Sequence, residues 1–391
     1  MLPHNVCSLT CIFDSFQFLR VSAMPSRISS VSIPSNSEWK ITNDASKQSL
    51  FDAAVRFVLS GGDPVPGSAD KQVSESHIVI NLRTNEEIQR GSTRLLAPTV
   101  RYGNLCVVDR DEIEGYRSIY QLLRDYLEFK RNKPISIAVF GPPGSGKSFG
   151  VREVANEVLK VTGTDSKAVT EPLVFNLAQF SEPDQLSSAF LRIGSEGTGG
   201  GVPLAFFDEF DSSLEGNDLG WLRYFLAPMQ DGEFFYNGQR QQIGRAILVF
   251  AGGTSSSFRS FSREDSNTSE KDKYSFVQAK GPDFISRLSG NINVLGVNRI
   301  EGAPDQSYVL RRAVIIRHRL RQMKMLGRTR RAIVDERFLA KLLQVGRYKH
   351  GARSIEMILK MCVGNNGTLH LPPPEQLSMH VDEGDIEPLL S

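Results

Sequence analysis

The sequence predicts an α/β fold, in which a five-stranded parallel sheet with helices on both faces is followed by a small all-helical domain. From residue 109 onward, short apolar runs alternate with amphipathic helical patterns, and this alternation is typical of a parallel sheet covered on both faces. After residue 303 the apolar pattern is helical only. The chain has 391 residues, 40% apolar and 23% charged, so it is long enough for a sizeable core and wholesale disorder is excluded.

The expected organisation has four parts. The first is an amino-terminal element without an assigned role, which we expect to be partly flexible because Ser, Pro, Gly and Asp are frequent in residues 25–47 and 60–76. It also holds strand-like runs at 77–82 and 105–108. A large α/β domain, a small helical domain and a carboxy-terminal tail follow. The expected boundaries are 1–108, 109–302, 303–366 and 367–391.

The first residues have only a faint likeness to a secretory signal. No Lys or Arg precedes the apolar part of residues 5–24, and Asp14 and Gln17 interrupt it. We interpret this segment as an ordered or dispensable leader, with Met24 as an alternative start of translation.

Cysteine content and apolar runs limit the class of protein. Cys7 and Cys11, with His4, have a spacing that zinc could use, but no second Cys/His pair lies nearby, so free thiols are the simpler interpretation. Four cysteines are too few for a disulfide scaffold and favour a reducing compartment, hence a cytoplasmic location. No apolar run reaches the roughly 18 residues of a membrane helix, so we expect no membrane association. The net charge of +2 singles out no partner.

The α/β region begins with a helix at 112–130, which carries one apolar face. A second helix, at 147–160, follows the first strand, and two more helices are expected at 335–345 and 351–362. The polar stretch 255–280 is expected to be a long loop. The five expected strands are 135–140, 173–177, 203–207, 246–251 and 291–295.

A phosphate-binding loop follows the first strand. Residues 141–148 read GPPGSGKS, a full match to G-x-x-x-x-G-K-[ST]. Glycines let the backbone N–H groups surround phosphates, the lysine reaches the β- and γ-phosphates, and the hydroxyl of the last residue coordinates Mg²⁺. The predicted strand before the loop and helix after it are the context that this mechanism requires. The expected nucleotide-binding residues here are Gly141, Pro142, Pro143, Gly144, Ser145, Gly146, Lys147, Ser148 and Phe149.

An acidic pair ends a later apolar strand, at residues 204–209 (LAFFDE). Asp208, at the carboxyl end of the strand, is placed to hold Mg²⁺ directly or through water. Glu209 is placed to polarise the water that attacks the γ-phosphate. One strand–helix unit after a phosphate loop, this pair favours hydrolysis of the nucleotide over binding alone.

Taken in order, these motifs resemble an AAA+ ATPase, a branch of the P-loop NTPases. Residues 225–255 are similar to the part of the Clp-type clade in which a β-hairpin precedes the sensor-1 strand, and Asn237-Gly238 is a turn dipeptide for that hairpin. The resemblance covers roughly residues 109–362. Three further segments match in the family's order: EIEGYRSI at 112–119 with the adenine-side segment, GPDFISRL at 281–288 with the arginine-finger segment, and HGARSIEMIL at 350–359 with the sensor-2 helix.

The resemblance implies two arginines of the site. Arg287 would reach into the neighbouring subunit's site and stabilise charge that develops on the γ-phosphate. Arg353 would contact the phosphates from the helical domain, which the resemblance makes a lid over the site. The alternative for each is a surface arginine on a helix, without a role in the site.

The resemblance also implies a water-positioning residue and an adenine pocket. Thr254 would act as sensor 1, where the family usually has asparagine, and Ser255 is the rival for that role. Ile113 and Gly115 would line the adenine pocket.

One family feature is missing. Threading unfoldases carry an aromatic–hydrophobic–glycine pore loop between the second strand and the acidic strand. Residues 175–201 contain Phe180 and Phe190 without that pattern. The sequence therefore does not predict a motor that threads polypeptides.

A basic helix opens the helical domain. Residues 311–331 hold nine Lys and Arg and no acid. Such a stripe is the electrostatic footprint of nucleic-acid binding. The alternatives, which we favour, are a solvated face with outward arginines or a contact with an acidic neighbouring subunit, because no aromatic residues interleave with the arginines.

Together these features predict an ATPase that uses ATP and Mg²⁺. We expect a ring-like homo-oligomer whose sites are completed between subunits and which remodels an unidentified protein partner. The alternatives are an AAA+ protein that acts on nucleic acid through Arg311–Arg331, and a nucleotide-gated oligomeric scaffold with slow hydrolysis.

Overall fold

The structure, a computed structural model, describes most of the chain from residue 75 onward. The chain divides into two units, 1–43 and 44–391, and every described residue belongs to the second. The leader 5–24, the trio His4, Cys7 and Cys11, and Met24 therefore lie outside the described residues. The described residues are Phe51, Ala54, Val55, Val58, 75–81, 94–129, 131–162, 172–198, 200–266, 268–302, 305, 307–323, 336–362 and 371–390.

A five-stranded parallel sheet forms the centre of the α/β domain, as predicted. The strand order is β10-β4-β9-β6-β5, so β4, the first strand of this sheet in sequence, lies inside the sheet with β10 and β9 on its two sides. In open α/β sheets, ligands bind outside the carboxyl ends of such central strands. The strands are β4 (Ile135–Phe140), β5 (Leu173–Asn176), β6 (Leu204–Asp208), β9 (Ile247–Ala251) and β10 (Gly290–Asn293).

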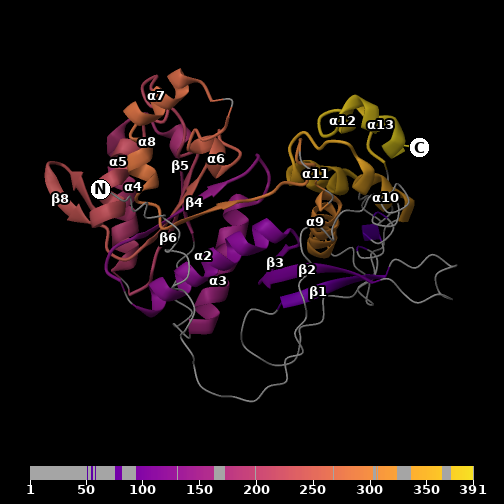
Figure 1. The fold of residues 1–391 in the computed structure, drawn as a ribbon, viewed down its shortest axis with the longest axis horizontal. Helices are drawn as coiled ribbons and strands as arrows, with labels where there is room; N and C mark the ends of the chain where they lie inside the picture. Colours follow the sequence, from indigo (N-terminus) through magenta and orange to yellow (C-terminus); the bar gives the residue numbers. More distant parts are fainter. Residues whose placement is uncertain are drawn as a thin grey trace, which may run out of the picture. The chain divides into compact units, whose positions relative to one another are not determined.

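Helices cover both faces of this sheet. Alternate side chains of β4 point to opposite faces: Ile137 and Val139 join one apolar cluster, and Ala138 and Phe140 join the other. The first cluster includes α2 (Arg110–Glu128) and α3 (Lys147–Thr162), which lie side by side in Figure 1. The second includes residues of α4 (Pro183–Gly197), α5 (Leu222–Asp231) and α8 (Gly281–Ile285).

Phenylalanine rings fill the second cluster and hold the strand ends together. Phe207 of β6 and Phe250 of β9 both contact Phe225 of α5, each with ring centroids 4.9 Å apart. Phe250 also meets Phe284 of α8 at 5.0 Å. Edge-to-face aromatic pairs of this kind stabilise a core beyond the area they bury. Phe190 is 2% exposed and belongs to this core, so it is not a pore-loop aromatic.

An antiparallel sheet precedes α2. Its strands are β1 (Glu75–Asn81), β2 (Arg94–Tyr102) and β3 (Leu105–Val107). The runs expected at 77–82 and 105–108 correspond to β1 and β3, whereas β2 was not expected. From β3 the chain passes directly to Asp109, whose carboxylate caps α2 by accepting from the N–H groups of Asp111 and Glu112.

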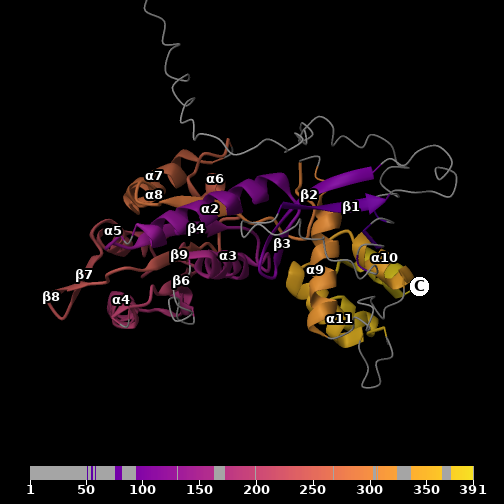
Figure 2. The same ribbon diagram turned by 90° about the horizontal axis from the view of Figure 1, so that it is seen from below.

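The region between α5 and β10 differs in part from expectation. The hairpin of β7 (Glu233–Tyr236) and β8 (Gln239–Gln242) forms at Asn237-Gly238, whose positive φ angles of 49° and 72° suit a two-residue turn (Figure 2). The long loop expected at 255–280 instead contains α6 (Phe258–Phe261) and α7 (Glu270–Gln278). The phenylalanines of both helices pack into the aromatic core. The helices are short and their sequence is mostly polar, so they show no apolar periodicity from which they could be predicted.

The helical domain contains α9 (Tyr308–Gln322), α10 (Glu336–Gln344) and α11 (Ala352–Cys362). The expected tail is also helical: α12 (Pro374–Leu377) and α13 (Glu383–Leu390) follow, and α13 contacts α10. The carboxylate of Asp385 holds α13 there by accepting from the N–H of Gly346 at 2.9 Å. None of the helices in the described ranges is long and apolar enough to cross a membrane.

The arginines of the basic helix α9 do not all face outward, contrary to expectation. Arg311, Arg312 and Arg317 are 5%, 0% and 4% exposed. Arg312 donates to the backbone carbonyls of Val297 and Leu343 at 2.8 Å, and Arg317 donates to that of Val58. Because these guanidinium groups are buried and donate to the chain's own backbone, they are not available to nucleic acid.

Candidate functional site

The loop at 141–148 connects β4 to α3. Three of its glycines have left-handed or otherwise positive φ angles: 150° at Gly141, 74° at Gly144 and 90° at Gly146. At Gly141 an added Cβ would also collide with the carbonyl oxygen of Val294, after β10. These positions therefore require glycine, and the N–H of Gly150 returns to the carbonyl of Gly146 as α3 begins. The structure thus has the strand–loop–helix arrangement in which backbone N–H groups receive phosphate.

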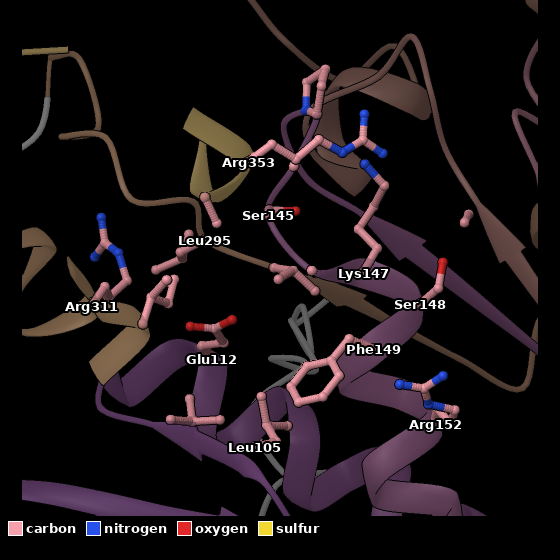
Figure 3. Close-up of a pocket in the computed structure, with 18 of the residues that line it drawn as sticks. Leu105, Glu112, Ser145, Lys147, Ser148, Phe149, Arg152, Leu295, Arg311 and Arg353 are labelled. Atoms are coloured by element: carbon pink, nitrogen blue, oxygen red, sulfur yellow. The ribbon is translucent and has the colours of Figure 1, made fainter. Parts of the chain in front are cut away.

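Lys147 lies at the start of α3 with its ammonium group over the loop. Its Nζ donates to the carbonyl oxygens of Gly141 at 2.8 Å and Pro142 at 3.3 Å. Burial lowers the pKa of Lys147, and the nearby Arg353 acts in the same direction while acidic groups oppose it. Figure 3 shows the two basic side chains converging at one end of the cavity. Two cations held this close favour a polyanionic ligand.

Ser148 and Asp208 form a pair suited to a magnesium ion. The Ser148 hydroxyl donates to Oδ1 of Asp208 over 3.4 Å, across from the carboxyl end of β6. Burial raises the pKa of Asp208, although the Ser148 hydroxyl and Lys147 oppose the rise. A cation would compensate this carboxylate for its desolvation. One hydroxyl and one carboxylate, with phosphate oxygens and water, are donors that Mg²⁺ accepts, so these residues fit the ion.

Glu209 lies in the same cavity with an unusual backbone. Its φ of 55° is in the left-handed region, which non-glycine residues seldom adopt. Its N–H donates to the carbonyl oxygen of Ala251 at 2.9 Å, and a Cβ on Gly253 would lie 2.8 Å from its Cγ. Backbone strain of this kind persists only where surrounding contacts hold the residue in place, and it is most frequent at functional sites.

Asp211 was not anticipated from the sequence and organises the segment after β9. Its buried carboxylate accepts three backbone N–H groups: from Gly253 at 2.8 Å, and from Thr254 and Ser255 at 3.0 Å each. The Thr254 hydroxyl donates to the backbone carbonyl of Asp211 at 3.3 Å. Neither Thr254 nor Ser255 lines the cavity, whereas Gly253 does. The structure therefore brings the segment to the site, with both candidate sensor residues set back from it.

The helical domain closes one side of the cavity. Arg353 is exposed and lines it from the first turn of α11. The N–H of Ala352 donates to the carbonyl oxygen of Gly144 at 3.2 Å, so α11 begins against the loop. Arg353 and Lys147 thus reach the cavity from two domains.

Arg287 does not line this cavity and lies just after α8. Its Nε donates to Oε1 of Gln230 at 3.0 Å, and its Nη1 donates to the carbonyl oxygen of Asp283. Its side chain is 24% exposed. The residue is therefore not placed to act on this chain's own cavity.

The cavity has a volume of about 670 Å³, within the range typical of ligand pockets. Ile113 and Gly115, expected in the adenine pocket, do not line it. Ile113 is buried in the core and a Cβ on Gly115 would meet Ile292, because both face the sheet. Glu112 and Tyr116 line it instead, with residues 104–108. The lining thus includes β3 from the amino-terminal element.

Several lining residues escaped sequence analysis. Asn176 ends β5 next to Asp208, its partner in the parallel register, and the side chain also caps the short helix η2 (Leu177–Gln179). A polar residue at the end of a predicted strand was the signal that could have identified it. His318 of α9 faces Phe149 of α3 with ring centroids 5.7 Å apart, and no local pattern indicates that contact.

No family model and no curated protein match the chain. Solved structures do match. The ORC2 protein of Aeropyrum pernix, in ADPNP–ADP complexes, has a TM-score of 0.42 at 11% identity over 72% of this chain and 68% of its own. NtrX from Brucella abortus in complex with ATP has a TM-score of 0.39 at 14% identity, over 65% of this chain and 52% of its own. The S. cerevisiae Hsp104–ADP complex has a TM-score of 0.31 at 18% identity, over 56% of this chain and 36% of its own. Likenesses this distant carry no conclusion about function.

Proposed function

We propose that this chain is an AAA+ ATPase that binds ATP with Mg²⁺ in the cavity and hydrolyses it to ADP and phosphate. One observation carries the proposal. The glycine loop, Lys147, the Ser148–Asp208 pair and Glu209 line one cavity, together with Arg353 from the helical domain. Their residue types are those that phosphoryl transfer requires: backbone donors, cations and a carboxylate near the attacking water.

Each residue has a distinct role in this proposal. The N–H groups of the loop and the Lys147 ammonium bind and orient the phosphates. Ser148 and Asp208 hold Mg²⁺, which neutralises phosphate charge when bound. Glu209 accepts a hydrogen bond from the attacking water and orients it. Arg353 contacts the phosphates from the helical domain, which acts as a lid. Sensor 1 remains assigned to the segment that Asp211 holds, with Thr254 proposed ahead of Ser255.

Arg287 supports a site that is completed between subunits. Arg287 does not line the cavity of its own chain, and its side chain is partly exposed just after α8. We therefore propose that it enters the neighbouring subunit's cavity in a ring-like homo-oligomer and stabilises charge on the γ-phosphate. Remodelling of a protein partner, a place in the Clp-type clade and a cytoplasmic location complete the proposal. The nucleic-acid alternative loses the support of Arg311, Arg312 and Arg317, which are buried.

The test is phosphate release per subunit over a wide range of protein concentration, with Mg²⁺ and saturating ATP. We expect the specific activity to rise steeply with concentration. Arg287→Ala should abolish the rise and leave nucleotide binding intact, and the exposed Arg192→Ala on α4 is the matched control. Glu209→Gln should bind ATP and release no phosphate. Failure of wild-type protein to bind any nucleotide would refute the proposal, and flat, near-zero activity with normal binding would favour the slow-hydrolysis scaffold.

A further inference from the structure

A carboxyl group lies at the end of the cavity away from the phosphate loop, where the proposed hydrolysis does not use it. Glu112, in the first turn of α2, is 7% exposed and lines the cavity. Figure 3 shows its carboxyl group facing the space between Leu105 and Leu295, on the far side from Lys147. A ligand whose phosphates lie on the glycine loop would therefore extend its other end toward this group.

The surroundings of Glu112 suit a flat, mostly apolar ring with one polar edge. Apolar walls with few, convergent polar groups are typical of such ligand sites. The walls come from three elements that are distant in sequence: β3, the segment after β10, and α9. The apolar residues with which these segments line the cavity are Leu105, Val107, Val108, Val294, Leu295, Val314 and Ile315.

Arg311 is the cation that acts on Glu112 electrostatically, but its guanidinium forms its hydrogen bonds with other groups. Its Nη2 donates to Asp305 at 2.6 Å and its Nε donates to the carbonyl oxygen of Gly296 at 2.7 Å. Its Nη1 donates to Asp305 at 3.1 Å and to the Ser307 hydroxyl at 2.6 Å. Within the described ranges, Glu112 forms no ion pair. Its carboxyl group is thus buried without a dedicated cation.

Burial raises the pKa of Glu112 to about 8, and Asp109 raises it as well, whereas Arg311 and the Leu295 backbone lower it. Tyr116 lies one turn further along α2, and the other charged or titratable groups that line the cavity outside the phosphate site are Cys106, Arg152, His318 and Arg319. Near neutral pH the carboxyl group therefore carries a proton. It then offers one acceptor, its carbonyl oxygen, beside one donor, its O–H.

A second polar group, the hydroxyl of Tyr116, is buried one turn further along α2. Tyr116 is 0% exposed and lines the cavity, and its hydroxyl has no hydrogen-bond partner among the described residues. Gly150 of α3 makes room for it, because an added Cβ there would overlap the hydroxyl. The hydroxyl therefore lies against the backbone of α3 and stays buried without a partner among the described residues, so the polar group that a ligand in the cavity would meet at this end is the carboxyl group of Glu112.

We propose that the carboxyl group of Glu112 selects adenine by reading its N6/N7 edge: the carbonyl oxygen accepts from the 6-amino group and the O–H donates to N7. Adenine presents a donor next to an acceptor at this edge, whereas guanine presents two acceptors, O6 and N7. Guanine would therefore set O6 against the carbonyl oxygen of Glu112. This inference rests on the proposed function, since it places the base in the cavity whose other end binds phosphate.

The experiment measures binding of ADP, GDP and 7-deaza-ADP to the full chain with Mg²⁺, by isothermal titration calorimetry. Wild-type protein should bind ADP at least about tenfold more tightly than GDP, the ratio expected when one or two hydrogen bonds are lost. It should also bind 7-deaza-ADP several-fold more weakly than ADP. Glu112→Met should bind all three ligands with affinities within about twofold of each other.

Glu112→Gln is the informative companion variant. Its amide also offers one acceptor and one donor, so it should keep the preference for ADP, but it cannot titrate. In the wild type the affinity for ADP relative to 7-deaza-ADP should therefore fall between pH 6.5 and 9, because the carboxylate has no O–H to donate to N7, whereas this ratio should not change in Glu112→Gln. The matched controls are Glu114→Met and Glu114→Gln, at an exposed position of the same helix outside the cavity.

The outcomes separate this inference from the proposed function. Equal affinity of wild type for ADP and GDP, or an unchanged preference in Glu112→Met, refutes the role of Glu112 and leaves the ATPase proposal standing. If Glu112→Met does not fold, wild-type binding of 7-deaza-ADP decides: affinity equal to that of ADP refutes the N7 contact. Absence of binding of any of the nucleotides refutes both.

Discussion

The backbone N–H of Ala352 donates a hydrogen bond to the carbonyl oxygen of Gly144 over 3.2 Å. One residue begins helix α11 and the other belongs to the phosphate loop, so this bond joins the two walls of the cavity. Gly351 permits the approach: its φ is 58°, and a Cβ there would lie 2.9 Å from the carbonyl oxygen of Pro143. The phosphate loop and the first turn of α11 are therefore in direct contact.

Gly351→Ala should weaken nucleotide binding. The substitution places a side chain in a left-handed backbone and pushes it against the loop, which together cost about 1–2 kcal/mol, so the dissociation constant for ADP should rise about tenfold. Calorimetry of ADP binding measures it. The control is Gly384→Ala on α13, where nothing lies within 4 Å of an added Cβ. Unchanged ADP affinity in Gly351→Ala would show that the contact does not shape the site.

Asp211→Asn should slow phosphate release more than it weakens nucleotide binding. The amide group has one acceptor oxygen, so it cannot serve all three N–H groups of residues 253–255, and leaving buried donors unpaired costs about 1–3 kcal/mol each. We expect a loss of turnover of at least tenfold and a smaller change in ADP affinity. Steady-state phosphate release and calorimetry separate the two. Asp218→Asn, at an exposed position, is the matched control, and equal turnover in both variants would contradict the expectation.

Arg312→Met should destabilise the helical domain. The guanidinium donates to the carbonyls of Val297 and Leu343, and its Cζ lies 4.8 Å and 5.0 Å from the ring centroids of Tyr308 and Tyr348. Methionine fills part of the volume but leaves those buried carbonyls unpaired, at a cost of about 3 kcal/mol or more. Denaturant unfolding measures the loss of stability.

Arg347→Met is the control for that prediction, because Arg347 is exposed. It should change the free energy of unfolding by no more than about 0.5 kcal/mol. Equal stability of the two variants would mean that the bonds of Arg312 to the backbone contribute nothing net.

The stability of the protein should depend on pH through Glu112. Its pKa is raised from 4.5 to about 8 in the folded state, so the unfolded chain releases the proton first as the pH rises. The stabilising contribution is therefore fully present below pH 4.5 and is lost progressively up to pH 8, by at most about 1.4 kcal/mol per pH unit. Glu112→Gln should be less sensitive to pH over this interval. Denaturant unfolding at pH 5.5, 6.5 and 7.5 tests this, and parallel pH profiles of variant and wild type would contradict it.

The pattern of apolar residues along the chain was enough to predict the central sheet. Strands at 135–140 and 246–251 were predicted to within one residue of β4 and β9, because short apolar runs beside Gly and Pro identify buried strands. The phosphate loop and the acidic pair Asp208-Glu209 were also evident, since each motif is contiguous and its mechanism depends on neighbouring residues.

Tertiary structure decided what contiguous patterns do not contain. The directions of Arg312 and Arg317 in α9 depend on carbonyl groups more than ten residues away, so two arginines of a basic stripe that appeared solvated proved to be buried. The lining of the cavity brings Glu112 and Tyr116 together with β3 and α9, where Ile113 and Gly115 had been expected. Sequence by itself determined the strands, the loop and the residue types of the site, because these follow from local periodicity and contiguous motifs. Only the folded chain determined which side chains face the cavity and which hold the domains together, because burial and hydrogen bonding are set by partners distant in sequence.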